Sequence, residues 1–245
     1  MKPFDRTRRS DAAELMDADD VDYDTFRGCL SDLAAVNRLS LGYRPTLEFL
    51  SGLARDGRWP RDRALRVIDV GCGYGDTLRA ISHWATKRGL AIDLTGVDRN
   101  PWSARAAAEA TPQGMKIAWR TADIFDYRPD DSVDVIVSAL FTHHLDDAAL
   151  LRFLVWMEGA AAVGWFINDL HRHQLAFSGF KAASRALRLH PFVQHDGPVS
   201  FARSFVPADW RRMLAEAGVQ GARVVGDHDV VPPAVQLVQI GRAHV

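Results

Sequence analysis

The stretch VIDVGCGYGD, residues 67–76, constrains the fold of this chain most strongly. An apolar run over 64–70 predicts a buried strand, and helical spacing of apolar residues over 77–89 predicts a helix directly after it. The turn between them contains three glycines, Gly71, Gly73 and Gly75. Because glycine lacks a Cβ, the backbone amides of such a turn can lie directly against a bound molecule. The sequence therefore predicts a ligand site between this strand and this helix.

Strand and helix patterns alternate through the rest of the chain. Further strands are predicted over 91–98, 115–120, 133–140 and 162–169. Helices are predicted from Pro101, over 146–159 and over 206–218. This alternation predicts an α/β fold, doubly wound around a mostly parallel sheet. Two last strands, over 222–227 and 234–239, are separated only by the short turn HDVVPP and should pair antiparallel, which gives seven strands.

The chain divides into a main domain and three additions. Residues 1–60 read as a helical prefix or cap, and residues 61–239 as the main domain. Residues 170–205 form an insertion after the fifth strand, which is predicted to be a substrate lid. The last six residues, 240–245 (IGRAHV), are what one reading frame of a common sequencing-library adapter would encode. They are predicted to be a non-native tail and are excluded from the fold prediction.

Composition narrows the classes of partner. The chain has 30 lysines and arginines against 31 acidic residues, so its net charge of −1 lacks the basic excess of a general nucleic-acid binder. Its two cysteines, Cys29 and Cys72, lie far apart, and the N-terminus carries no apolar leader. We therefore expect a cytoplasmic protein that acts on a small molecule and not on nucleic acid. The sequence leaves the oligomeric state open.

Two acidic residues near the glycine turn indicate the type of ligand. A dinucleotide site would have glycine at the sixth position of its G-x-G-x-x-G pattern, whereas this chain has Asp76 there. A carboxylate at this point repels a pyrophosphate and accepts an ammonium group. Asp98 ends the second predicted strand, where an acidic side chain can accept both ribose hydroxyls. A nucleoside with a cationic tail is therefore expected, and a nicotinamide-dependent oxidoreductase is the less favoured alternative.

Four segments occur in the order and spacing of a known family's motifs. They are VIDVGCGYG, LTGVDRN, TADIFDY and VDVIVSALFTHHLDD. Over about residues 65–170 the chain thus resembles the class I S-adenosylmethionine-dependent methyltransferases. VNRLSLGYRPTLEFL (36–50) is similar to a segment of the ubiquinone and menaquinone methyltransferases. FTHHL, FINDLHRH and HDGPVSFARSF are similar to segments of O-methyltransferases of phenolic polyketides such as alkylresorcinols. The resemblance implies a Rossmann-like fold and S-adenosylmethionine as the cofactor.

The resemblance also implies which residues hold that cofactor. Those expected at its methionine end are Asp69, Gly71, Cys72 and Gly73, with Gly75 in the same turn. Those expected at its ribose and adenine are Asp98, Arg99, Asp123 and Ile124, and Ser138 completes the set. Asp69, Asp98 and Asp123 have an alternative role as caps of strand ends and loops. Residues of the prefix either close over the cofactor or only pack against the domain; they are Asn37, Arg38 and Tyr43.

Catalytic candidates follow the fourth and fifth predicted strands. His143 and His144 come directly after the fourth, and Asp169 ends the fifth. The resemblance implies that His144, oriented by Asp169, is the general base for a phenol, with His143 as the second choice. The alternative is that both histidines only shape the pocket. The alternation in DLHRH also permits a divalent-ion set of Asp169, His171 and His173, but we expect no metal.

The predicted lid indicates the acceptor. Within residues 173–192 an apolar helical face and a basic face alternate. The apolar face consists of Ala176, Phe180, Ala183 and Leu187, and the basic face of Lys181, Arg185 and Arg188. Such a helix either packs on the body of the protein or makes transient contact with a membrane surface. The aromatic residues expected to wall the acceptor pocket are Phe141, Phe166, Phe177, Phe180 and Phe192. They favour the hydroxyl of a phenolic polyketide or a quinol; a catalytically silent binding module is the alternative function.

Overall fold

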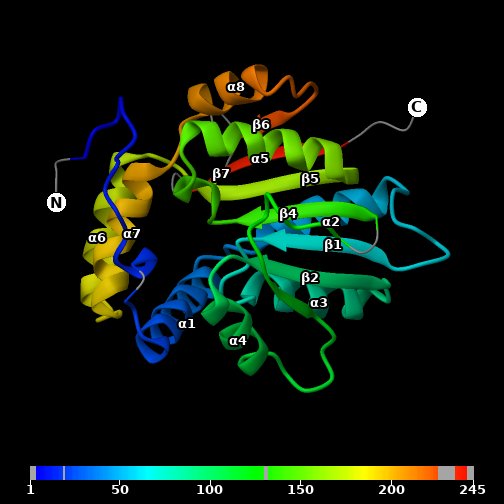
Figure 1. Ribbon diagram of the computed structural model, residues 1–245, viewed down its shortest axis with the longest axis horizontal. Coiled ribbons are helices and arrows are strands. Elements are labelled where there is room, and N and C mark those ends of the chain that lie inside the picture. The colour runs from blue at the N-terminus through cyan, green and yellow to red at the C-terminus, as the bar shows by residue number, and fades with distance from the viewer. Residues whose placement is uncertain (1–3, 19, 130–131, 226–234, 242–245) are drawn as a thin grey trace.

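The fold is built on one sheet of seven strands in the order β3-β2-β1-β4-β5-β7-β6 (Figure 1). The computed structural model describes residues 4–18, 20–129, 132–225 and 235–241. The strands are β1 (Leu65–Val70), β2 (Ile92–Asp98), β3 (Ala118–Thr121), β4 (Val133–Ala139), β5 (Ala161–Leu170), β6 (Arg223–Val225) and β7 (Val235–Gly241). The α/β fold predicted from the alternating patterns is confirmed, and β3 begins three residues later than predicted.

Five of the strands account for the parallel part of the sheet. β1 pairs in parallel with β2 and β4, and β2–β3 and β4–β5 pair in the same way. β7 instead pairs antiparallel with both β5 and β6. Five of the seven strands are therefore parallel, and the antiparallel pairing predicted for the last two strands is confirmed. The HDVVPP turn between them lies outside the described residues.

Helices cover both faces of the sheet, as the doubly wound prediction requires. They include α2 (Arg44–Arg55), α3 (Asp76–Arg88), α4 (Pro101–Glu109), α5 (Asp147–Ala160) and α8 (Pro207–Glu216). Successive residues of β1 serve opposite faces: Val67 packs with α2 and α3, whereas Ile68 packs with α5 and α8. A strand buried on both faces must be apolar at nearly every position. This is why residues 64–70 show no alternation.

The first part of the N-terminal prefix, through α1, and the insertion lie together at one end of the sheet, whereas α2 packs on a face of the sheet (Figure 1). The prefix contains the short helix η1 (Leu15–Asp17), α1 (Tyr23–Leu39) and α2, so its predicted helical character is confirmed. The insertion forms two helices, α6 (Gln174–Ala186) and α7 (Pro191–Arg203), which pack against each other. The N-terminal segment, residues 4–17, runs along this pair, and Ser10 N donates a hydrogen bond to Ala202 O at 2.9 Å.

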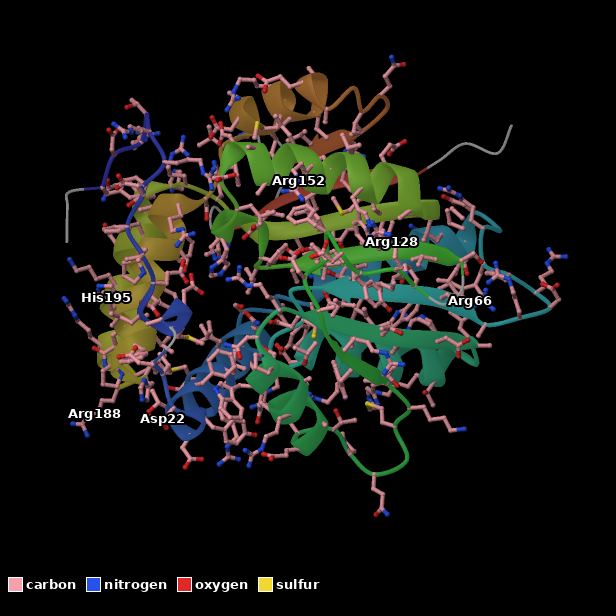
Figure 2. All side chains as sticks on the ribbon, in the orientation of Figure 1. Asp22, Arg66, Arg128, Arg152, Arg188 and His195 are labelled. Atoms are coloured by element: carbon pink, nitrogen blue, oxygen red, sulfur yellow. The ribbon has the colours of Figure 1, made fainter. Side chains whose placement is uncertain are left out.

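The buried face of α6 differs from the predicted one. Phe177 and Ser184 are buried, whereas Ala183 is exposed and Leu187 is 62% exposed. Phe4 of the N-terminal segment packs on Phe177, with ring centroids 4.8 Å apart, and Phe180 packs on Phe201 of α7 at 5.7 Å. The inward side of α6 therefore contains Phe177 and Phe180, and of the predicted face Phe180 is part of it whereas Ala183 and Leu187 are not. Figure 2 shows Arg188 pointing away from the body of the protein.

The predictions about membrane contact through the lid and about a non-native tail stay predictions. Among the helices that the structure describes, none is both long and apolar enough to cross a bilayer. β7 extends to Gly241, two residues into the predicted non-native tail. Because strand pairing uses backbone groups that every residue carries, this pairing does not test where the tail came from.

Candidate functional site

The turn between β1 and α3 combines left-handed backbone with close aromatic packing. Gly71, Gly73 and Gly75 have φ of 70°, 47° and 71°. A Cβ on Gly71 would lie 2.5 Å from the ring of Phe141, and one on Gly75 would lie 2.2 Å from Trp119. Glycine is therefore required here by packing as well as by conformation.

We expect Gly71→Ala to destabilise the protein by about 2–5 kcal/mol, because left-handed strain and a clash with Phe141 add. Gly89→Ala is the matched control: Gly89 also has a left-handed φ of 63°, but nothing lies within 4 Å of its added Cβ. That variant should lose only about 1–2 kcal/mol. Equal losses for the two variants in urea unfolding would contradict the packing argument.

Asp98, at the end of β2, holds the glycine turn through its carboxylate. Gly73 N donates to Oδ2 and Asn100 N to Oδ1, both at 2.9 Å. Burial raises the pKa of Asp98, and these hydrogen bonds only partly oppose the effect. Asp98, the residue predicted to bind the ribose, therefore lies at the glycine turn. Both of its carboxylate oxygens face the backbone amides of Gly73 and Asn100.

Asp69, at the end of β1, carries a buried oxygen without a partner. The residue is 1% exposed, and its Oδ1 has no hydrogen-bond partner in the structure. Burial, and then repulsion from Asp76 and Asp98, raises its pKa well above the usual value of 3.8. Buried polar atoms are normally satisfied, so an orphan beside two further carboxylates marks a place for a cationic donor. The predicted cofactor's ammonium group fits this donor set.

Residues of the prefix close onto the third of these carboxylates. The Tyr43 hydroxyl donates to Asp76 Oδ2 at 2.8 Å, and Asn37 Nδ2 donates to the same oxygen at 3.2 Å. Burial, and then the charge of Asp76, raises the pKa of Tyr43, and Arg38 opposes this through its charge. Asn168 Nδ2, on β5, donates to Gly42 O at 2.8 Å and ties the same loop to the sheet. The prefix thus covers the helix end where a pyrophosphate would otherwise bind.

The remaining predicted cofactor residues hold the surrounding backbone. Ser138 Oγ donates to Val70 O at 3.0 Å, which joins β4 to β1 at the ligand edge. Asp123 Oδ1 accepts from Phe125 N at 2.9 Å and so caps its own turn. Of the other predicted cofactor residues, Cys72 and Ile124 are buried, and Arg99 is exposed. Direct contact of these residues with a cofactor stays a prediction.

The histidine paired with Asp169 is His143, and the predicted pairing with His144 is wrong. His143 Nδ1 lies 2.7 Å from Asp169 Oδ1, and both residues are buried. His143 N donates to Asp169 Oδ2 at 2.9 Å, and the Thr142 hydroxyl donates to the same oxygen. Because a carboxylate only accepts, the proton of His143 is assigned to Nδ1. Burial acts to raise the pKa of Asp169, but His143 and Thr142 outweigh it and lower that pKa.

His144 turns toward the N-terminal segment instead. Its Nδ1 lies 3.2 Å from Asp17 Oδ2, and its side chain is 30% exposed. Glu14 lies beside both rings, 3.9 Å from His143 Nε2 and 3.8 Å from His144 Nε2. Burial acts to lower the pKa of His144, but Asp17 and Glu14 outweigh it and raise that pKa. The sequence analysis missed Glu14 and Asp17, since no motif surrounds them and well over 100 residues separate them from the histidines.

Two arginines hold the histidine loop, η2 (Thr142–His144), through hydrogen bonds to its backbone carbonyls. Arg203 donates to the carbonyls of His143 and His144 at 3.2 and 3.0 Å. Arg9 donates to those of His143 and Leu145 at 3.3 and 2.8 Å. Neither arginine stood in a motif, and their role follows only from how the N-terminal segment and α7 pack against this loop.

The metal set predicted as an alternative does not assemble. β5 ends at Leu170, so strand alternation does not continue to His171 and His173. His173 caps α6, accepting from Leu175 N at 3.3 Å, whereas Asp169 faces His143. Within the described ranges, the histidine and carboxylate ligand atoms that do converge belong to Glu14, His143 and His144.

A cavity of about 800 Å³ lies between the N-terminal segment and the α6–α7 pair. Apolar residues supply much of its lining, namely Phe4, Phe177, Pro198, Val199 and Ala202, together with Arg6, Arg8 and Arg9. Arg9 connects the cavity to the histidine loop. Of the five predicted aromatic walls only Phe177 lines it. Phe166 stacks on Phe49 in the core, and Phe141 packs on Phe153.

Comparison with known proteins gives one family match and a set of relatives. Residues 67–160 match the family described as Methyltransferase domain. Trans-aconitate 2-methyltransferase of Azoarcus sp. (strain BH72) is 35% identical over 101 residues, which are 40% of this chain and 37% of that protein. The protein of that name from Mycobacterium tuberculosis (strain ATCC 25177 / H37Ra) is 28% identical over 161 residues, 64% and 57% of the two chains. The chain thus spans less than two thirds of either relative.

Solved structures share the fold at low sequence identity. The plantazolicin methyltransferase BpumL, in complex with a monoazolic desmethylPZN analog and SAH, gives a TM-score of 0.62 at 12% identity, over 90% of this chain and 96% of that one. Magnesium protoporphyrin IX methyltransferase (ChlM) from Synechocystis PCC 6803 with bound SAH gives 0.54 at 14% identity, over 83% and 84%. Residues 67–160 are thus similar to a methyltransferase domain, and the seven-stranded sheet of this chain has the fold of these solved methyltransferases.

Proposed function

We propose that this protein transfers a methyl group from S-adenosylmethionine to an oxygen of a small, largely apolar acceptor. One observation carries the proposal: the unpartnered Oδ1 of Asp69, in a group of three carboxylates, lies at the same edge of the sheet as the buried His143–Asp169 pair. A site for a cationic nucleoside thus lies beside a site that accepts a proton. Ligands of open α/β sheets bind at this edge.

The carboxylates divide the recognition of the cofactor between them. When bound, S-adenosylmethionine supplies a methyl group on a sulfonium that needs no further activation. Asp69 would accept the ammonium through its free oxygen, and Asp98 would accept the ribose hydroxyls. Tyr43 and Asn37 keep Asp76 in place. The chain then has to hold the acceptor in line with the methyl group and take its proton.

We assign the proton acceptor to His143, oriented by Asp169. The Nδ1–H bond to Asp169 leaves the lone pair on Nε2, on the side of Glu14. A buried carboxylate also stabilises the imidazolium that forms when the proton arrives. A buried base favours a neutral hydroxyl that ionises only as the base takes its proton, since a charged amine would have to lose its hydration first.

The cavity beside the N-terminal segment supports an apolar acceptor, such as a phenolic polyketide or a quinol. Its apolar lining suits the body of such a molecule. A second candidate is a small organic acid, because Arg6, Arg8 and Arg9 also line the cavity and the matched relatives are named for trans-aconitate.

A competition assay with methyl-labelled cofactor tests the proposal. The purified protein is offered an alkylresorcinol, a quinol, trans-aconitate, a polar amine and a small RNA in equal amounts. We expect label in one of the oxygen acceptors and matching release of S-adenosylhomocysteine. Labelling of the amine or RNA alone would overturn the acceptor assignment. Cofactor binding without label in any acceptor favours a silent binding module, and binding of NADH alone favours the oxidoreductase alternative.

We expect Asp69→Asn to stabilise the cofactor-free protein at pH 7 and to weaken its affinity for S-adenosylhomocysteine. Folding raises the pKa of this acid, so its ionisation destabilises the folded state once the pH exceeds the unfolded value near 3.8. The gain in unfolding free energy, about 1–2 kcal/mol at pH 7, should shrink as the pH falls toward 3.8 and vanish below it, where Asp69 becomes protonated in both states. Thermal unfolding across this range measures the difference; a gain independent of pH would contradict it.

A further inference from the structure

We propose that Glu14, His143 and His144 form a binding site for a divalent transition-metal cation of the Zn²⁺ type. His143 Nε2 lies 3.9 Å from Glu14 Oε1, and His144 Nε2 lies 3.8 Å from Glu14 Oε2. The ligand atoms of the three residues all lie within 4.8 Å of one another. Two ligands come from η2 and the third from the N-terminal segment, so the site exists only where these two parts of the chain meet.

Each imidazole is oriented as a metal-binding histidine is. His143 Nδ1 lies 2.7 Å from Asp169, and His144 Nδ1 lies 3.2 Å from Asp17. Histidines that bind metals usually donate the other ring N–H to a carboxylate or carbonyl, which fixes the ring and the tautomer. Here both Nδ1 atoms have such a partner, and both Nε2 atoms face the one carboxylate of Glu14.

The distances between the two Nε2 atoms and the Glu14 carboxylate suit a cation bound between them better than direct hydrogen bonds. Distances of 3.8 and 3.9 Å are too long for hydrogen bonds between Nε2 and the carboxylate. Ligands at ~2.0–2.2 Å from a tetrahedral Zn²⁺ lie ~3.4 Å apart, so the two separations from Glu14 would have to shorten by ~0.5 Å, and all three ligand atoms already lie within 4.8 Å of one another. Ser200 Oγ donates to Glu14 Oε1 at 3.0 Å and helps to hold the carboxylate in position.

Charge around the cluster favours a divalent cation. Glu14, Asp17 and Asp169 face the two rings, whereas one guanidinium, that of Arg203, lies 3.9 Å from Glu14 and 3.8 Å from Asp17. The nearby Arg9 is paired with Asp147 at 3.0 Å. Three carboxylates against the single guanidinium of Arg203 leave negative charge in a site of low exposure, where an uncompensated charge is costly.

The donor set indicates the class of metal. Two imidazole nitrogens and one carboxylate oxygen bind Zn²⁺, and also Fe²⁺ and its neighbours, in preference to Mg²⁺ or Ca²⁺, which take oxygen ligands. A cation here would join the N-terminal segment to the histidine loop. The cation would occupy the Nε2 lone pair of His143, which the proposed function uses as the proton acceptor, so bound zinc should inhibit methyl transfer. Metal binding is measured without cofactor or acceptor, and methyl transfer is measured on the chelator-treated, zinc-free chain, so the two proposals are tested separately.

Calorimetric titration of the chelator-treated full chain with ZnCl₂ tests this site. We expect one Zn²⁺ per chain, and visible absorption of low-coordinate Co²⁺ when CoCl₂ replaces zinc. His144→Gln and Glu14→Gln should each weaken the affinity at least about 10-fold, and Asp17→Asn should weaken it about 10-fold or more. His195→Gln is the control: His195 is paired with Asp196 at 2.8 Å and is not among the three ligand residues, so this variant should bind zinc like the parent.

Several outcomes would overturn the site. These are no binding by the parent chain, an affinity unchanged by both His144→Gln and Glu14→Gln, or preferential binding of Mg²⁺ over Zn²⁺. His144 is 30% exposed, so its replacement serves as the decisive variant if Glu14→Gln does not fold. Absence of zinc binding together with methyl transfer would reject this site and keep the proposed function; zinc binding without methyl transfer would do the reverse.

Discussion

His143→Ala should lower the rate of methyl transfer about 10²- to 10⁴-fold while the affinity for S-adenosylhomocysteine stays within about twofold. The reason is that His143 Nε2 is the proposed proton acceptor, and Asp169 holds the ring through Nδ1 at 2.7 Å. Turnover is measured with the acceptor that takes up most label in the competition assay, and affinity by calorimetry. A loss confined to turnover separates a base from a residue that only shapes the cofactor site.

Two further variants separate His143 from its neighbour. Asp169→Asn should follow His143→Ala in turnover, because an amide can present its N–H to Nδ1 and so favour the wrong tautomer. His144→Ala should cost less than about 10-fold, since its partner is Asp17 at the edge of the site. If His144→Ala abolishes turnover and His143→Ala keeps it, the assignment from the structure is wrong and the one from the sequence stands.

Asp98→Ala should weaken binding of S-adenosylhomocysteine by about 1.5–3 kcal/mol, roughly 10- to 150-fold, through loss of hydrogen bonds to a charged acceptor. The carboxylate also holds Gly73 N at 2.9 Å, so part of the loss reflects a less ordered glycine turn. Calorimetry on folded protein measures the change.

Asp93→Ala is the matched control for this variant. Asp93 is an exposed acid on the same strand, β2, paired with Arg66 in the sheet and far from the glycine turn. Its removal should leave the affinity unchanged. Equal affinity of Asp98→Ala and the parent would remove the ribose assignment, and weakening by both variants would indicate a general effect of charge.

Local patterns in the sequence determined the fold and the place of the cofactor site. Mostly apolar residues over 64–70, three glycines and then a helical period predict a buried strand, a tight turn and a helix from local patterns alone. The structure places β1 and α3 there, and Gly89 ends α3 in the left-handed conformation. Because parallel strands present their carboxyl ends at one edge, Asp69 and Asp98 could be brought together before any contact was known.

Only the tertiary structure decided which groups act together at the histidine loop. His143 and His144 are adjacent in sequence, so no sequence pattern shows which of them pairs with Asp169. The conformation of η2 directs His143 to Asp169 and His144 to Asp17. Glu14 reaches both rings because the N-terminal segment packs along α6 and α7, and in the same packing Phe4 covers Phe177, which the predicted face of α6 did not include. The contacts of the N-terminal segment join residues more than 100 positions apart, and the His143–Asp169 pair joins residues 26 apart. They depend on how whole elements fit together, which no local spacing of residues encodes.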